Sequence, residues 1–137
     1  MALRFPPRAG TLAICRFPAP GMAAAAEMVK NRPVIVVSRI LRGRHGLATV
    51  VPVSMTRPNV PRRWHVLVPA DAMPHGWSDK PGERWAKCDM VTTVSLERLS
   101  LANARRHAGR PVYGGAEVDE LILRQIREAL GYIFELF

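Results

Sequence analysis

Cysteine, acidic residues and long apolar segments are all scarce in this chain of 137 residues. The two cysteines, Cys15 and Cys88, lie far apart in segments expected to be strands, so we expect buried free thiols and no disulfide. No apolar run approaches the roughly 20 residues that span a bilayer, and no apolar segment of signal-peptide length follows the N-terminus. No set of metal-ligating side chains has metal-site spacing. We therefore expect a cytoplasmic protein with no membrane segment, no metal and no other cofactor.

The scarcity of acidic residues leaves a formal net charge of +9, from 20 basic and 11 acidic side chains. This charge is unevenly placed. The segment 117–137 holds five acidic residues and two arginines, a balance of −3, so the remainder of the chain carries +12. A basic body beside an acidic segment favours a polyanion, RNA or DNA, as the partner of the body. The alternative is that the charge only keeps a small protein in solution.

What the chain does contain is a series of short, β-branched apolar segments separated by turn residues. Strands are expected near 10–17, 33–41, 46–54, 64–68 and 85–93. Residues 1–8 are expected to form a flexible tail, and 9–137 a single domain. Between Val118 and Phe134, apolar residues recur at helical spacing and predict an amphipathic C-terminal helix. The pattern predicts a mainly β (α+β) fold, a small barrel capped by this helix.

An arginine precedes the most apolar of these strands, where Asn31-Arg32-Pro33 runs directly into Val34–Ser38. Because proline disfavours helical geometry in the residue before it, Arg32 is expected to be extended. Its planar guanidinium group fits two oxygens of a phosphate, and its charge does not change near neutral pH. Arg32 is therefore the first candidate for binding an anionic substrate. The alternative is an ordinary solvated arginine at the start of a strand.

Two more segments follow in order: Leu47–Ser54, which ends in Val-Pro-Val-Ser, and Asp89–Leu99. With Arg32-Pro33 before them, they resemble the MazF/PemK family of toxin endoribonucleases from bacterial toxin–antitoxin pairs, over about residues 9–135. That family has Arg-Pro, an apolar strand, Val-Pro-x-Thr/Ser, and later Asp-Gln-Ile-Arg-Thr-Val-Asp-x-x-Arg-Leu. Here Met90 replaces the family's glutamine and Thr92 its arginine, a departure that concerns both the RNA sequence that is cut and the rate of cleavage.

The resemblance implies an SH3-like small β-barrel of the MazF/CcdB type with a C-terminal helix, usually a homodimer. It implies a toxin that cleaves single-stranded RNA without metal, by attack of the neighbouring 2′-hydroxyl, and that is inhibited by a cognate acidic antitoxin. One alternative is a non-catalytic SH3-like module that binds nucleic acid or protein. Another is a gyrase poison like CcdB, whose activity resides in a C-terminal Trp-Gly-Ile, whereas this chain ends in Glu-Leu-Phe.

Metal-free RNA cleavage needs groups that move two protons and a group that stabilises the charge on the phosphorane. We assign charge stabilisation to Arg32. Ser54, at the position of the family's threonine, can donate its hydroxyl to a phosphate oxygen, with Thr56 as its substitute. Histidine transfers protons near neutral pH, and His65 is the candidate for this role. The residues expected to contact the rest of the RNA are Lys30, Asn31, Thr56, Arg57, Arg62, Arg63 and Trp77. Trp77 is expected to be the exposed tryptophan.

Overall fold

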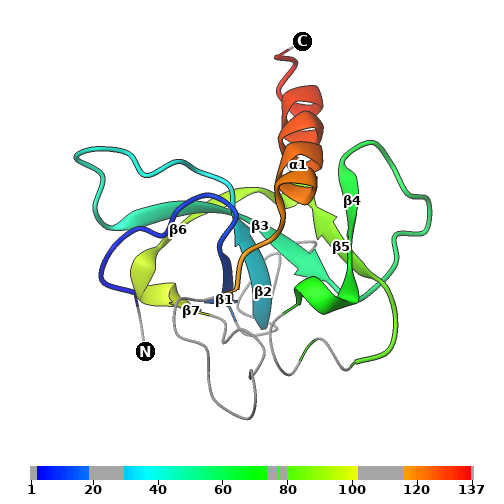
Figure 1. Cartoon of the computed structure of the whole chain (residues 1–137), viewed down its shortest axis with the longest axis horizontal. Coiled ribbons are helices and arrows are strands. Elements are labelled where there is room, and N and C mark those ends of the chain that lie inside the picture. The colour runs from blue at the N-terminus through cyan, green and yellow to red at the C-terminus, as the bar shows by residue number, and fades with distance from the viewer. Residues whose placement is uncertain (1–2, 19–29, 74–76, 78–79, 102–115, 137) are drawn as a thin grey trace.

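The mainly β fold with one C-terminal helix is confirmed by the computed structural model, which describes residues 3–18, 30–73, 77, 80–101 and 116–136 (Figure 1). Within these ranges the elements in chain order are β1 (Leu12–Arg16), β2 (Asn31–Val36), β3 (Leu47–Ser54), β4 (His65–Val68), η1 (Ala70–Ala72), β5 (Arg84–Lys87), η2 (Cys88–Met90), β6 (Thr92–Ser95), η3 (Leu96–Arg98), β7 (Leu99–Leu101) and α1 (Glu120–Ile133). The connection 19–29 between β1 and β2 lies outside the described residues.

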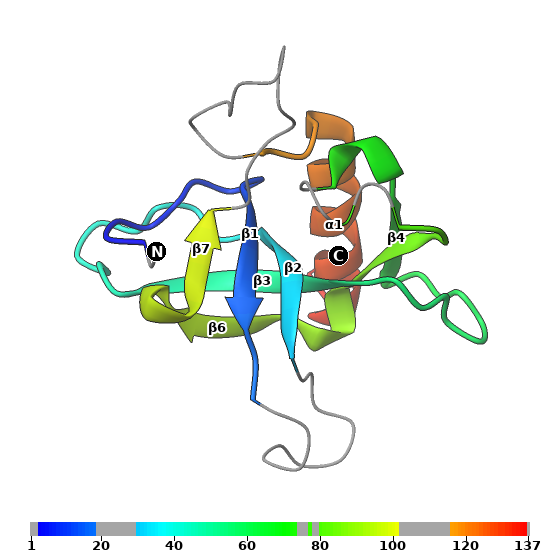
Figure 2. The same ribbon diagram turned by 90° about the horizontal axis from the view of Figure 1, so that it is seen from below.

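The strands form one antiparallel sheet in the order β4-β5-β3-β2-β1-β7, with β6 also paired to β3. The long strand β3 pairs with β6 along Leu47–Val50 and with β5 at Val53 and Ser54. Strands β7, β1, β2, β3 and β6 form one continuous part of the sheet, with β7 and β6 at its two edges. The chain runs from β6 through η3 directly into β7, so these two edges are connected and the part curves around one core. We call this part the barrel, and the extension formed by β5 and β4 the wing. In Figure 2, β6 and β7 lie on one side of the molecule, and α1 and β4 on the other.

Two hydrophobic cores lie on opposite faces of the shared strands. Alternate residues point into the barrel, where Ala13, Cys15, Val34, Val36, Ala48, Val50, Val94, Leu96 and Leu99 pack together. The residues between them face α1 and belong to the second core. This core contains Leu12, Ile35, Val51, Val53 and Val66 from the strands and Ile122, Leu123 and Ile126 from α1. Strand β2 is therefore buried on both faces, which explains why its sequence is continuously apolar after Arg32.

The predicted C-terminal helix is present over Glu120–Ile133, but Leu121 and Phe134 of its predicted apolar face are exposed. Asp119 is the N-cap residue, and its carboxylate accepts a hydrogen bond from the backbone N–H of Ile122 at 2.9 Å. The apolar face of α1 covers the second core, while Phe134 and Leu136, just beyond the helix, are 56% and 74% exposed. No helix in the described ranges is both long enough and apolar enough to cross a bilayer.

Three details differ from the sequence prediction. The strand expected over 33–41 ends at Val36, because the N–H groups of Val37 and Ser38 both donate to the carbonyl of Thr49 and regular pairing stops there. The strand expected over 85–93 is two strands, β5 and β6, separated by η2. Both pair with β3, but at opposite ends of it, and the chain needs the turn to change from one to the other. The short strand β7 was not expected.

Residues 3–8, which were expected to form a tail, contact the barrel. The backbone N–H of Leu3 donates to the carbonyl of Leu99 at 3.2 Å, and the Leu3 side chain packs against the barrel core. Arg8 donates two hydrogen bonds of 2.6 Å to the carboxylate of Glu117. This pair joins the N-terminal segment to the segment that leads into α1.

Candidate functional site

Arg32 and Ser54 lie at the same end of two neighbouring strands. Strands β2 and β3 pair with Val34 opposite Pro52, and the same register continued by two residues sets Arg32 opposite Ser54. Residues that lie directly opposite in a sheet project from the same face. The structure therefore brings these two predicted residues together, at the end of the barrel where β1 ends and β2 begins. We call this place the barrel mouth.

Ser54 is held in place by a local hydrogen bond. Its side chain is 4% exposed, and its Oγ accepts a hydrogen bond from the backbone N–H of Thr56 at 3.1 Å. Thr56 itself lies past the end of β3 and is exposed. The hydroxyl in register with Arg32 is therefore that of Ser54, and Thr56 orients it.

The entry into β2 has an unusual backbone conformation. Lys30 has φ of 68°, in the left-handed region that residues other than glycine seldom adopt. Its N–H donates to the carbonyl of Pro18 at 3.1 Å, and its carbonyl accepts the N–H of Phe17 at 3.1 Å. These bonds hold Lys30 and Asn31 beside the end of β1, where Asn31 pairs with Arg16. Both predicted RNA contacts are thus at the barrel mouth.

Two more arginines stand at the barrel mouth, and the sequence reasoning missed both. The Nε–H of Arg98 donates to the carbonyl of Arg16 at 2.7 Å, and the guanidinium of Arg16 donates to the carbonyl of Glu97 at 3.2 Å. The Arg98 guanidinium also lies 5.5 Å from the Phe17 ring. Backbone carbonyl groups and a ring do not neutralise these charges, so they add to the positive potential at the mouth.

His65 lies at the start of β4, opposite Lys87 of β5. Since β5 lies between β4 and β3, the backbone of β4 is about 10 Å from that of β3, at roughly 4.8 Å per strand spacing. The side chains of Lys87 and Trp85 stand between His65 and Ser54 on this face. The structure therefore does not place His65 directly beside the Arg32–Ser54 pair.

The environment of the His65 ring favours its neutral form. The backbone N–H of Arg62 donates to Nδ1 at 2.9 Å, and the ring meets Trp85 edge-on at 6.5 Å. Burial lowers the pKa of His65 below its ordinary value, and the nearby cations Lys87 and Arg62 act in the same direction. The carboxylate of Asp89 opposes this shift without reversing it.

The other predicted RNA contacts lie on the loops around the wing. Arg57 forms an exposed ion pair with Glu83 at 3.6 Å. The guanidinium of Arg63 lies 4.2 Å from the centre of the Tyr132 ring. Trp77, expected to be exposed, is partly buried and packs against the core that faces α1. It therefore lies on the opposite face of the sheet from Arg32 and Ser54.

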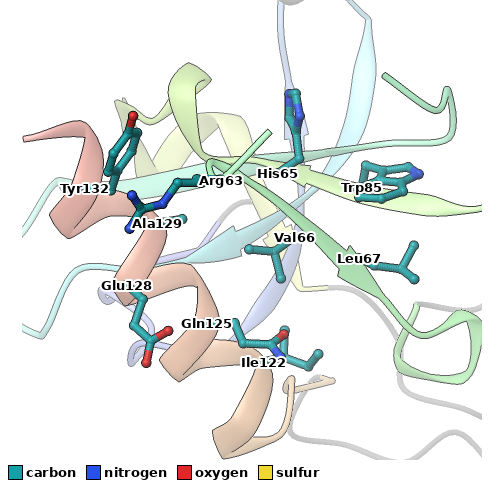
Figure 3. Close-up of a pocket in the computed structure, with 10 residues that line it drawn as sticks. All are labelled: Arg63, His65, Val66, Leu67, Trp85, Ile122, Gln125, Glu128, Ala129 and Tyr132. Atoms are coloured by element: carbon teal, nitrogen blue, oxygen red, sulfur yellow. The ribbon is translucent and has the colours of Figure 1, made fainter. Parts of the chain in front are cut away.

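A groove of about 940 Å³ runs beside β4 and α1. It is lined by Arg63, His65, Val66, Leu67, Trp85, Ile122, Gln125, Glu128, Ala129 and Tyr132 (Figure 3). In Figure 3, His65 and Val66 lie on opposite sides of β4, and Val66 is on the side of α1. The groove thus reaches both the α1 side and the face that carries Ser54.

Sequence comparison matches this chain to a known protein family. A family model described as PemK-like, MazF-like toxin of type II toxin–antitoxin system matches residues 8–134. The chain belongs to this family. MazF-family toxins are in general endoribonucleases, and the resemblance inferred from Arg32-Pro33, Leu47–Ser54 and Asp89–Leu99 is confirmed.

The chain is also similar to individual proteins. The uncharacterised protein YifN of Escherichia coli (strain K12) is 30% identical over 121 residues, which are 77% of this chain and 80% of YifN. MazF of Deinococcus radiodurans (Form-I) has 21% identity and a TM-score of 0.61, covering 94% of this chain and 96% of that one. An endoribonuclease solved in complex with its cognate antitoxin, from a mycobacterial species, has 20% identity and a TM-score of 0.59, covering 96% and 97%. These structures share the fold.

Met90 and Thr92, which replace the glutamine and the arginine of the family's motif, lie beyond the barrel mouth. Met90 ends η2 and is half-buried, and Thr92 begins β6 opposite Val50 and is exposed. Neither shares the row formed by Arg32 and Ser54. The departures thus leave the geometry of that pair as the sequence of β2 and β3 sets it.

Proposed function

We propose that this protein is the toxin of a type II toxin–antitoxin pair and that it cuts single-stranded RNA, including mRNA, at a short specific sequence in the cytoplasm. The observation that carries the proposal is that Arg32 and Ser54 lie at the same end of the paired strands β2 and β3, two residues beyond the Val34–Pro52 pair, at a barrel mouth that also holds Arg16, Lys30 and Arg98. A polyanion enters such a site readily, and a phosphate is the group that its donors fit.

The proposed reaction needs no metal, because the RNA supplies its own nucleophile. The 2′-hydroxyl before the cut gives up its proton and attacks the phosphorus, and the bond to the 5′-oxygen breaks as that oxygen takes up a proton. The upstream fragment keeps a 2′,3′-cyclic phosphate and the downstream fragment begins with a 5′-hydroxyl, so the protons balance. Arg32 binds two phosphate oxygens and stabilises the negative charge that develops on the phosphorane. The Ser54 hydroxyl donates to a phosphate oxygen, and Lys30 and Asn31 bind the adjoining backbone.

The direct test is incubation of the purified protein with mixed-sequence single-stranded RNA in excess EDTA. We expect discrete fragments that carry a 2′,3′-cyclic phosphate, and no cutting when deoxyribose replaces the ribose before the cut. A requirement for magnesium, or cutting of an all-DNA strand, would contradict the mechanism. Binding without cleavage would indicate a non-catalytic module, and topoisomerase inhibition without cleavage a gyrase poison.

The proposed partners are a second copy of the chain and an acidic antitoxin. Phe134 and Leu136 expose apolar surface beyond α1, which suits a symmetric contact between two copies. An antitoxin segment rich in Asp and Glu, with a few apolar anchors, would be attracted to the +12 body and cover the barrel mouth. Inhibition would then come from occupation of the RNA site.

A further inference from the structure

The groove beside β4 holds three side chains on the face that carries Arg32 and Ser54. Leu67 pairs with Trp85, and Trp85 pairs with Ser54, so one row of residues runs from the wing to the barrel mouth. His65 precedes Leu67 by two residues and so shares its face. Figure 3 shows His65, Leu67 and Trp85 away from α1. A chain of nucleotides bound at Arg32 and extending along this row would reach them.

Hydrogen bonding decides which nitrogen of His65 carries the proton. Since the backbone N–H of Arg62 donates to Nδ1, this nitrogen is an acceptor, and the neutral ring has its proton on Nε2. The edge-on contact with Trp85, with 82° between the ring planes, restrains the orientation of the ring. Among the residues that the structure describes, none accepts a hydrogen bond from Nε2. His65 therefore presents one fixed donor to the groove.

Protonation of His65 would break this arrangement. A proton on Nδ1 would displace the Arg62 N–H, and the charged groups that act on the ring include two cations, Arg62 and Lys87, and one carboxylate, Asp89. The burial of the ring and these groups together lower the pKa of His65, so the neutral form of the ring is favoured. A neutral ring with a fixed N–H donor is suited to recognising a hydrogen-bond acceptor on a ligand rather than to donating protons in a reaction.

The surroundings of this donor fit a nucleobase. Leu67 is 48% exposed and offers an apolar surface beside the indole of Trp85. Arg63, held over Tyr132, provides a cation at the edge of the groove for the backbone phosphate of the same nucleotide. Proteins that read single-stranded RNA combine an apolar surface, a hydrogen bond to the base edge and a nearby cation in this way.

We propose that His65 and Leu67, which lie against the buried Trp85, bind one base beside the scissile phosphate, and that the Nε2–H of His65 donates to a carbonyl oxygen or ring nitrogen of that base. The inference rests on the proposed RNA cleavage. It assigns His65 to base recognition instead of proton transfer, because Lys87 and Trp85 separate it from Ser54. His65 then determines sequence preference at one position next to the cut.

The test compares cleavage of RNA libraries, each randomised at one position around the cut, by wild type, His65→Phe and His45→Ala. Phenylalanine keeps a ring against Trp85 but has no donor, and His45 is an exposed histidine on the loop between β2 and β3. For His65→Phe we expect preference at one flanking position to fall about 3- to 10-fold, the effect of one lost hydrogen bond. Preferences elsewhere, kcat on the best remaining sequence and the pH profile should not change. His45→Ala should behave as wild type.

Three results with His65→Phe would overturn the assignment. A fall of kcat on every sequence, with one limb of the pH profile lost, would make His65 a proton-transfer group. A uniform rise of KM without altered preference would make its role structural or confined to the backbone. If wild type cuts RNA and His65→Phe changes nothing, only this inference fails; if wild type neither cuts nor binds RNA, the proposed function fails with it.

A measurement on the unaltered protein covers the case in which His65→Phe folds poorly. In protein with ¹⁵N-labelled histidine, RNA with deoxyribose before the cut should shift the Nε2 resonance of His65 and leave that of His45 unchanged. The Nδ1 signal of His65 should remain that of an unprotonated nitrogen. An unchanged Nε2 resonance in RNA-saturated protein would refute the contact.

Discussion

Replacement of Arg32 by alanine tests the assignment of the barrel mouth most directly. Arg32 is half-buried at the start of β2, and its side chain belongs to neither hydrophobic core. We therefore expect the free energy of unfolding to change by no more than about 1 kcal/mol, as for other substitutions outside the core. Its backbone pairing with Cys15 does not depend on the side chain.

The effect on cleavage should be far larger. Removal of one preorganised donor to a developing oxyanion lowers kcat about 10²- to 10³-fold in other enzymes, roughly 3 to 4 kcal/mol of transition-state stabilisation. Arg32 offers two donors and a full charge, so its loss should reach at least the upper part of this range. Arg32→Lys keeps the charge but loses the planar pair of donors, and we expect an intermediate rate.

The assay is single-turnover cleavage of a fluorescent RNA, with unfolding in urea measured on the same preparations. Arg124→Ala is the matched control, because Arg124 is an exposed arginine on α1, away from the barrel mouth. We expect Ser54→Ala to lower the rate of cleavage about 10-fold, less than Arg32→Ala does, since a neutral hydrogen-bond donor contributes less than a charged one. Near wild-type cleavage by Arg32→Ala, with the control also active, would refute the site.

Substitution of Phe134 and Leu136 by serine should convert a homodimer into a monomer in sedimentation velocity at micromolar concentration, and a monomeric wild type would contradict the proposed contact. Burial raises the pKa of the Cys88 thiol to about 12, so the unfolded thiol ionises before the folded one and stability should fall as pH rises between about 9 and 12. Urea unfolding across this range should show that fall, and Cys88→Ala should weaken it. Antitoxin peptide and non-cleavable RNA should compete in fluorescence anisotropy, with affinities that decrease as salt is added; simultaneous binding of both would show that inhibition acts elsewhere.

The position of Arg32 and Ser54 at the same end of β2 and β3 could be predicted, because these strands are next to each other in sequence and pair in the sheet. Pro33 fixes the extended geometry of Arg32, and the apolar run after it marks a strand buried on both faces. The helix could be predicted for a similar reason, since its periodic apolar face and its N-cap Asp119 are local features. Both elements can be predicted from a few neighbouring residues, without knowledge of contacts between distant parts of the chain.

The cations Arg16 and Arg98 could not be found in this way. They meet through a hydrogen bond between residues 82 positions apart, and that contact exists only because β7 returns to pair with β1. β7 has three residues and no distinctive sequence pattern, so it could not be predicted from the local sequence. The family motif includes Arg98 but does not indicate what lies beside it.

The position of His65 depends on the order of the strands in the sheet, in which β5 lies between β3 and β4. Consecutive strands are neighbours in most sheets, and on that expectation β4 would lie beside β3 and bring His65 to Ser54. Instead β5 pairs with both, so Trp85 and Lys87 stand between the two residues. In the proposed mechanism, the chemistry at the barrel mouth and the recognition of bases on the wing depend on different strands. We therefore expect substitutions on β4 to alter which RNA sequence is cut, and substitutions at Arg32 or Ser54 to alter how fast any sequence is cut.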